Sequence, residues 1–168
     1  SPKSLGYYFP AEFAKHDAIW LTWPHKEESW PGKIASIYPS YTEFVKVVAL
    51  TERVCINVVD EKMRNSANKM LQLAGVDLTK VTFYLHPSND AWCRDHGPAI
   101  LVNQSGDERL IVDWGYNAWG GKYPPFDLDD VIIESKQLFH SKSPALRKIE
   151  DIDVYQRFDF IGQIAREM

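Results

Sequence analysis

Apolar and polar positions follow two different periods along the first two thirds of the chain. Short runs rich in branched and aromatic residues, each bounded by polar or turn-forming residues, predict strands. Between them, longer stretches repeat apolar residues every three or four positions, which predicts helices with one buried face. On these grounds we expect strands over residues 18–23, 54–59, 81–85, 99–102 and 109–113, and helices over residues 38–51, 61–74 and 127–139.

Turn-forming residues separate these expected elements. Gly75 is predicted to end the helix over residues 61–74, since glycine readily takes the left-handed backbone that closes many helices. The polar segment 104–107 joins two of the strands into a hairpin. Loops are expected at 25–33 and 114–125, the second rich in aromatic residues. Strands that alternate with helices, together with one hairpin, predict an α/β fold.

Composition narrows the class of protein. The chain has 168 residues, 45% hydrophobic and 25% charged, which is enough for one medium soluble domain with its own core. A net charge of −4 and the absence of Lys/Arg runs argue against a nucleic-acid surface. No apolar run reaches the length of a membrane span, and the N-terminus lacks the apolar core of a signal peptide. We therefore expect a cytoplasmic protein without nucleic-acid or membrane partners, and the start at Ser1 indicates that the N-terminus was trimmed.

The two cysteines give no sign of a metal centre. Neither a CxxC nor an HExxH pattern occurs and the five histidines are scattered, so no metal and no cofactor are expected. Cys55 lies in an apolar run and is expected to pack as a small buried hydrophobe. A disulfide between Cys55 and Cys93 stays open but has no support from their spacing. Two isolated cysteines favour a reducing cytoplasm.

Most of the candidate chemistry lies in one segment, residues 89–98, with the sequence NDAWCRDHGP. It lies between two expected strands and brings together two carboxylates, a guanidinium, an imidazole, a thiol and an indole. Loops held by a scaffold are common places for functional side chains. The residues alone leave two interpretations open. One is an inert turn in which Asp90 and Asp95 cap backbone amides and neutralise Arg94, and the other is a functional site.

The segment NDAWCRDHGP resembles the signature loop of the agmatine deiminase family, which also contains the Porphyromonas-type peptidylarginine deiminases. Four further stretches are similar to that family in the same order. They are PAEF with HDAIWL, WPH, DWGYNAWGGKY and DLDD, within residues 10–21, 23–25, 113–123 and 127–130. The resemblance covers about residues 10–139, with several tryptophans at the family's spacing, and stops from about Ser141.

This resemblance implies the pentein fold, an α/β-propeller of five ββαβ-type modules around a pseudo-fivefold axis. The chain would supply about the first two modules, so the fold would be incomplete. We expect residues 1–140 to be the N-terminal part of the deiminase domain. Residues 141–168 are expected to form a tail outside the family pattern, with a short strand and a helix over 152–164.

The resemblance also implies a reaction, the conversion of a guanidinium to a urea with release of ammonia. In the family, acidic residues hold the cation and a cysteine thiolate attacks its central carbon. A histidine protonates the departing ammonia, and water hydrolyses the thiouronium intermediate. By position, Asp95 matches the catalytic aspartate that binds the guanidinium, and Trp92 matches a tryptophan of the substrate pocket. Asp90 and Arg94 are expected to order the loop as an ion pair.

A second family loop carries further candidates: Asp113, Trp114, Asn117 and Trp119. They are expected either to shape the substrate pocket or, equally, to be core aromatics with a turn-forming Asn. Trp119 is the substrate-binding candidate among them. The family's nucleophilic cysteine and its histidine belong to segments that do not occur in this chain. Cys93 and His96 fall at variable positions of the family, so neither is expected to be catalytic. The remaining histidines are assigned no role.

Three hypotheses follow. The first is the N-terminal part of a deiminase that hydrolyses agmatine to N-carbamoylputrescine and ammonia, or peptidyl-arginine to citrulline, with the isolated chain inactive. The alternative is a non-catalytic module that binds guanidino ligands or a partner chain. A third is a free-standing hydrolase that uses Cys93. The expected partner is the guanidino substrate, and a homo-oligomer is left open.

Overall fold

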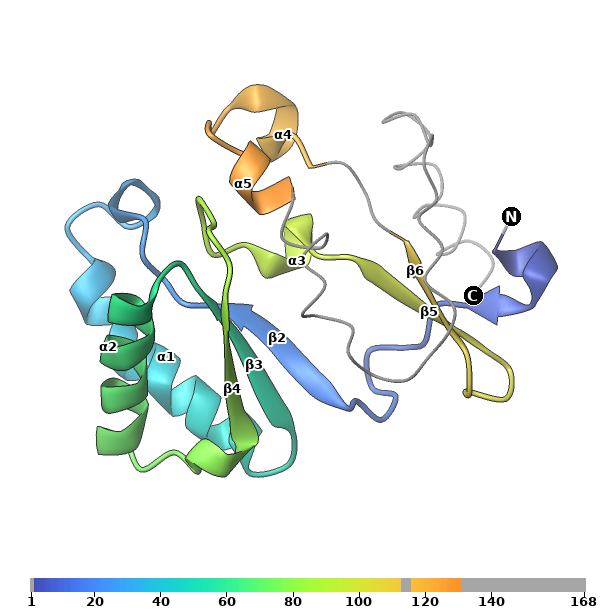
Figure 1. The fold of residues 1–168 in the computed structure, drawn as a ribbon, viewed down its shortest axis with the longest axis horizontal. Coiled ribbons are helices and arrows are strands. Elements are labelled where there is room, and N and C mark those ends of the chain that lie inside the picture. Colours follow the sequence, from blue (N-terminus) through green and yellow to red (C-terminus); the bar gives the residue numbers. More distant parts are fainter. Residues whose placement is uncertain (1, 113–115, 131–168) are drawn as a thin grey trace. The chain divides into compact units, whose positions relative to one another are not determined.

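The structure, a computed structural model, describes residues 2–112 and 116–130. It divides into two compact units. The larger unit contains Phe13–His96 and Tyr116–His140, and the smaller contains Ser1–Glu12, Gly97–Gly115 and Ser141–Met168. Each unit is described by itself (Figure 1).

The larger unit is built on a three-stranded parallel sheet in the order β2-β3-β4. Its strands are β2 (Ala18–Thr22), β3 (Arg53–Val58) and β4 (Val81–Leu85). Its helices are α1 (Ile34–Ala49), α2 (Glu61–Leu73) and the single turns α3 (Cys93–His96), α4 (Ala118–Gly121) and α5 (Asp127–Asp130), with 3-10 turns η2 (Glu27–Ser29) and η3 (Leu78–Lys80). The long helices α1 and α2 connect successive strands, as parallel pairing requires (Figure 1).

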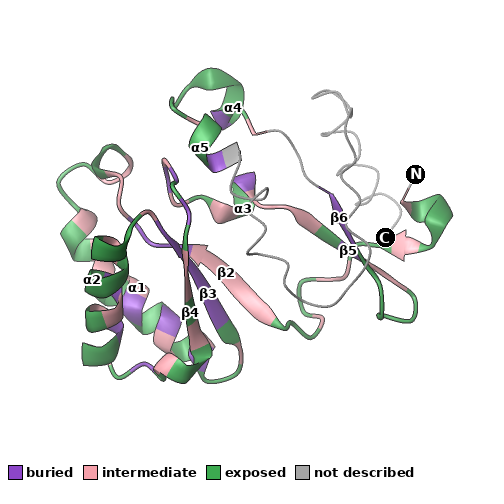
Figure 2. Ribbon diagram, in the orientation of Figure 1, coloured by how far each residue is buried: buried purple, intermediate pink, exposed green. Residues whose placement is uncertain are grey.

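Side chains of the sheet alternate between two faces. On the face toward α1 and α2, alternate residues of the central strand are fully buried in a core that both helices share: Val54, Ile56 and Val58 with Val45, Ala49, Ala67 and Leu71. Figure 2 shows β3 as an almost continuously buried strand. The other face carries Trp20 and Tyr84, whose rings lie 4.7 Å apart, together with Cys55. Among the described residues, the apolar core of this unit therefore lies on the helix face of the sheet.

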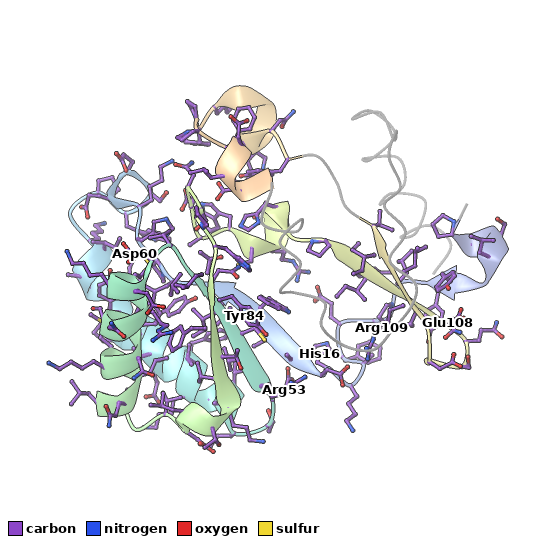
Figure 3. All side chains as sticks on the ribbon, in the orientation of Figure 1. His16, Arg53, Asp60, Tyr84, Glu108 and Arg109 are labelled. Atoms are coloured by element: carbon purple, nitrogen blue, oxygen red, sulfur yellow. The ribbon has the colours of Figure 1, made fainter. Side chains whose placement is uncertain are left out.

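The smaller unit holds a three-stranded antiparallel sheet in the order β1-β5-β6, with the 3-10 turn η1 (Lys3–Leu5) before it. Its strands are β1 (Tyr7–Tyr8), β5 (Ala99–Asn103) and β6 (Arg109–Val112). The Tyr7 hydroxyl donates to Glu108 Oε2 at 2.9 Å, near the labelled Arg109 in Figure 3. Gly106 has a φ of +74° in the turn of the hairpin, a conformation that favours glycine.

The helix signals of the sequence are confirmed at α2. The Asp60 side chain (Figure 3) accepts a hydrogen bond from the Met63 amide at 2.7 Å and so caps the first turn. Gly75 follows the last turn with a φ of +76°, as predicted. The helix α1 begins four residues earlier than the predicted start at residue 38, and Pro39 lies inside it. The predicted start rests on regular apolar spacing, which begins only at Tyr41.

Other differences concern short elements. The expected loops contain the single turns α3 and α4, and the two-residue strand β1 was not predicted, because such short pieces have no period to detect. The hairpin of β5 and β6 is confirmed. Asp113, Trp114, the remainder of the helix expected over 127–139, the domain boundary at residue 140 and the tail over 152–164 lie outside the described residues. Within the described part, no helix is both long and apolar enough to cross a membrane.

Candidate functional site

The segment with most of the predicted chemistry forms a tight turn beyond the carboxyl end of β4, on the larger unit. In α3, the amides of Asp95 and His96 donate to the carbonyl of Trp92 at 3.0 and 3.2 Å. Residues three apart on a helical turn lie on the same side of it, so this turn places Trp92 and Asp95 side by side. Both are exposed to solvent, Trp92 with 42% of its surface accessible.

Two other carboxylates near this turn are buried and engaged. Asp90 accepts the Ser29 hydroxyl at 2.5 Å and the Ala91 amide at 2.8 Å. Asp129, which is 1% exposed, accepts the backbone amides of Asn89 and Asp90 through one oxygen at 2.7 and 3.2 Å. Carboxylates that receive several such bonds hold a backbone firmly. This geometry favours the predicted loop-ordering role of Asp90, while its ion pair with Arg94 stays a prediction.

Asp95 is arranged differently from these two. Its side chain is exposed, and among the residues that the structure describes no hydrogen bond or ion pair engages its carboxylate. A surface carboxylate held on a fixed turn and not used by the fold is free to accept N–H donors of a cationic ligand. The structure therefore separates the carboxylates that hold the turn from the one that faces solvent.

The thiol of Cys93 is bonded to a strand residue. Its Sγ lies 2.8 Å from the Thr22 hydroxyl, and both cysteines of the chain are free thiols. Burial raises the pKa of the Cys93 thiol to about 11, with the hydrogen bond from Thr22 opposing part of this rise. A thiol with such a pKa is almost entirely neutral near pH 7 and is a poor nucleophile. This geometry argues against a hydrolase that uses Cys93.

A hollow of about 440 Å³ lies beside the turn. Aromatic side chains, two lysines and acidic groups line it: Lys26, Glu28, Ser29, Asp90, Trp92, Trp119, Lys122 and Tyr123. The Trp92 ring stacks on Trp30 at 5.9 Å, and the Trp119 ring meets Tyr123 edge-on at 5.8 Å. The structure thus brings together Trp92 and Trp119, two of the predicted substrate-binding residues, but Asp95 does not line this hollow.

The backbone that presents Trp119 is unusual. Ala118 and Trp119 have φ values of +48° and +55°, a region that side chains other than glycine rarely adopt. The Asn117 side chain accepts the Gly120 amide at 3.0 Å and stabilises this turn. Strained backbone of this kind tends to occur at functional sites. Asn117 therefore serves the turn itself, whereas Trp119 stands half exposed on the wall of the hollow.

His96 is buried on the inner side of α3. Only 3% of it is exposed, and neither ring nitrogen has a hydrogen-bond partner in the part of the chain that the structure describes. Burial lowers the pKa of His96, while the carboxylates of Asp129, Asp95 and Asp90 act in the opposite direction. Burial and these carboxylates also raise the pKa of Tyr116 to about 12. Among the described residues, no group of His, Cys, Asp or Glu has an arrangement that could hold a metal ion.

Several residues of this region carry no signal that sequence reasoning could use. Thr22, Asn57 and His86 were assigned no role, yet they are buried at the carboxyl ends of the strands and bonded to one another and to Cys93. Asn57 inside the apolar run of β3 was the one available hint, because a polar residue there needs a partner. In the sequence, Asp129 stands out only as part of the DLDD stretch at the start of the helix expected over 127–139.

Known proteins share the sequence pattern and the fold of this chain. A model of the family described as Porphyromonas-type peptidyl-arginine deiminase matches residues 8–153, which extends beyond the expected end at residue 140. A provisionally named agmatine deiminase of Vibrio parahaemolyticus is 37% identical over 123 residues, covering 73% of this chain and 32% of that protein. One from Enterococcus faecalis is 28% identical over 165 residues, covering 96% and 40%.

Solved structures show the same relationship. A variant of the C. jejuni agmatine deiminase with substrate bound superposes with a TM-score of 0.69 at 26% identity, over 87% of this chain and 40% of that one. The chain thus spans about a third to two fifths of the length of these relatives. The shared fold is the α/β pentein fold that the sequence predicted. With the family model matched over most of its length, the chain belongs to the Porphyromonas-type peptidyl-arginine deiminase family, whose members include agmatine deiminases.

Proposed function

We propose that this chain forms the guanidinium-binding part of a deiminase that hydrolyses agmatine to N-carbamoylputrescine and ammonia. The observation that carries the proposal is a difference in burial and hydrogen bonding among three carboxylates. Asp90 and Asp129 are buried and bonded to the turn, whereas Asp95 stands exposed beside Trp92, with no hydrogen bond or ion pair from residues 2–112 and 116–130 on its carboxylate. A carboxylate can take two N–H donors of a planar guanidinium at once, and an indole face attracts the same cation.

In the proposed reaction, a cysteine thiolate adds to the guanidinium carbon. An amino group of this adduct receives a proton, and its C–N bond breaks to release ammonia. Water then hydrolyses the thiouronium and releases the urea and the thiol. The family segments that supply this cysteine and the histidine do not occur in the present 168 residues. Cys93 cannot replace the nucleophile, because burial keeps its thiol protonated. We therefore propose that these groups belong to a longer protein and that the chain alone binds without turnover.

Agmatine is favoured over peptidyl-arginine by the relatives, several of which carry the agmatine deiminase name. Trp92 stands beside Asp95 and also lines the hollow, so a guanidinium at Asp95 leaves the rest of agmatine to extend over Trp92 toward Glu28, which offers a negative charge to the ammonium group. The product would be a precursor of putrescine, so we also propose a place in polyamine biosynthesis in the cytoplasm.

A second candidate is a binding module that holds guanidino ligands without reacting, because the exposed Asp95 beside Trp92 would serve binding alone equally well. The two are distinguished by incubating the purified chain, and a form extended to the full length of the family, with agmatine and with peptidyl-arginine. Ammonia and the ureido product are then assayed. We expect turnover of agmatine by the extended form only. Sustained turnover by the 168-residue chain would contradict this assignment, and no turnover by the extended form would support the binding module.

Asp95→Asn tests the site itself. The amide keeps the size of the carboxylate but loses its charge, and hydrogen bonds to charged groups contribute about 1.5–3 kcal/mol. We expect agmatine binding to weaken by that amount while the free energy of unfolding is unchanged, because the side chain is exposed. Glu43→Gln, an exposed carboxylate on α1 away from the turn, is the matched control. Titration followed by NMR measures both, and wild-type affinity in Asp95→Asn would refute the role.

A further inference from the structure

A continuous series of buried hydrogen bonds connects the ends of all three parallel strands to the first residue of α3. His86 Nδ1 lies 2.9 Å from Asn57 Oδ1, and Asn57 Nδ2 donates to Thr22 Oγ1 at 3.2 Å. The Thr22 hydroxyl is in turn 2.8 Å from Cys93 Sγ. Thr22, Asn57 and His86 are each 2–3% exposed, so water does not compete for these bonds. Buried polar groups satisfied in this way fix one arrangement.

The chemistry of the groups fixes the donors at the histidine end of the series. Asn57 Oδ1 can only accept, so His86 Nδ1 carries the hydrogen of a neutral ring. Burial lowers the pKa of His86, which keeps that ring neutral near pH 7. The Thr22 oxygen accepts from Asn57, and either the Thr22 hydroxyl or the Cys93 thiol supplies the hydrogen of the bond between them. Cys93 thus ends a series of hydrogen bonds that begins at the histidine.

This arrangement positions residues and does not activate a nucleophile. His86 is separated from Cys93 by two side chains and does not reach the thiol. What the series can fix is the location of α3. Thr22 and Asn57 are paired neighbours at the ends of β2 and β3, and His86 donates its amide to Val58 just after β4.

Resting on the proposed function, we infer that Thr22, Asn57 and His86 are positioning residues of the guanidinium site. They hold the Cys93 sulfur. Through this contact they set the orientation of Trp92, the residue before α3, and of Asp95 within α3. Cys93 is then neither incidental nor catalytic. It anchors the turn to the sheet, and any small acceptor at this position that reaches Thr22 will do the same.

The test compares Thr22→Val, which has the same shape without a hydroxyl, with Thr22→Ser, which keeps it. Thr22→Val removes the hydroxyl that bonds both Asn57 Nδ2 and Cys93 Sγ. We expect the ¹⁵N signals of the His86 ring and the indole Nε1–H signal of Trp92 to move. The agmatine dissociation constant is expected to rise about tenfold, the effect of about one lost hydrogen bond. Thr22→Ser is expected to restore both signals and the affinity, which a loss of general packing would not explain.

A second pair of variants tests the same contact from the Cys93 side, without changing a buried residue of a strand. Cys93→Ala deletes the acceptor on the partly exposed turn, and Cys93→Ser retains one. We expect Cys93→Ala to reproduce the changes of Thr22→Val, and Cys93→Ser to keep near-wild-type signals. Unchanged His86 and Trp92 signals in both Thr22→Val and Cys93→Ala would overturn the inference.

The outcome also separates this inference from the proposed function. If wild-type protein shows no agmatine-induced shift at Trp92, the function fails. The positioning role is still decided by the His86 and Trp92 signals of the free protein. If agmatine binds but Thr22→Val binds it with wild-type affinity, the function stands and the positioning role is refuted.

Discussion

The two faces of the β2-β3-β4 sheet are made by the same three strands, yet they carry different chemistry. Toward α1 and α2, alternate positions of β3 are fully buried aliphatic residues, Val54, Ile56 and Val58. On the opposite face the intervening positions are Cys55 and Asn57, and Thr22 on β2 lies beside Asn57. One face supplies apolar burial, and the other supplies hydrogen bonds for the turn that carries the candidate site.

The difference shows how a sheet can be stable and still display a site. Aliphatic packing on the helix face is not directional, so it stabilises the unit without fixing where α3 lies. The polar end of the other face contributes less free energy but is directional, because each hydrogen bond requires a particular donor and acceptor. Substitutions on the two faces should therefore differ in size and in kind.

The largest expected effect is on the helix face. Leu71 of α2 is completely buried in the core, and Leu71→Ala should lower the free energy of unfolding by about 2–5 kcal/mol through lost burial and the remaining cavity. Leu73→Ala on the same helix is the control, because Leu73 is 79% exposed and its change should stay within about 0.5 kcal/mol. Urea unfolding measures both. Equal effects would mean that the core is not where the structure places it.

A smaller loss is expected on the polar face. Asn57→Ala removes one hydrogen bond from each of the buried Thr22 and His86 side chains, which should cost about 1–3 kcal/mol. Asn65→Ala on the exposed side of α2 serves as the control for the loss of an amide. Unlike Leu71→Ala, this substitution should also shift the Trp92 indole signal. A purely energetic effect with no shift would break the proposed distinction between the faces.

The dependence of stability on pH sharpens the same comparison. Burial lowers the pKa of His86 in the folded protein, whereas an unfolded histidine titrates near about 6.5. As pH falls through that value the unfolded state takes up the proton first, so stability is present above it and is lost below it. Unfolding measured between pH 7 and pH 5 should show this loss, and His86→Gln should reduce the slope. An unchanged slope would show that His86 is not held neutral by the fold.

The smallest effect is expected for Cys93→Ser. The hydroxyl keeps an acceptor for Thr22, and Cys93 is not placed among reacting groups, so the free energy of unfolding should change by less than about 0.5 kcal/mol. Thiol alkylation followed by peptide mapping gives an independent check, since a neutral, only partly exposed thiol bonded to Thr22 should label slowly. Fast labelling of Cys93 that agmatine protects would place it in the site instead.

Sequence patterns alone determined much of this protein. The long helices, the parallel strands and the hairpin follow from periods of 3.6 and 2, because these report local backbone geometry and one-sided burial. The segment NDAWCRDHGP identified the family, because rare residues at fixed spacing are specific, while the roles of Asp95 and Trp92 stay predictions. Strand residues gave less information, since a polar residue such as Asn57 in an apolar run does not name its partner.

Only the tertiary structure decided which polar groups serve the fold and which face solvent. Asp90, Asp95 and Asp129 are the same residue type in the sequence. In the structure, Asp90 and Asp129 are buried against backbone amides, whereas Asp95 is exposed. The sulfur of Cys93 meets Thr22, a residue 71 positions earlier in the chain. Such contacts depend on strand register and on how a turn packs against strand ends. Local sequence does not encode them, because the partners become neighbours only after the sheet has formed.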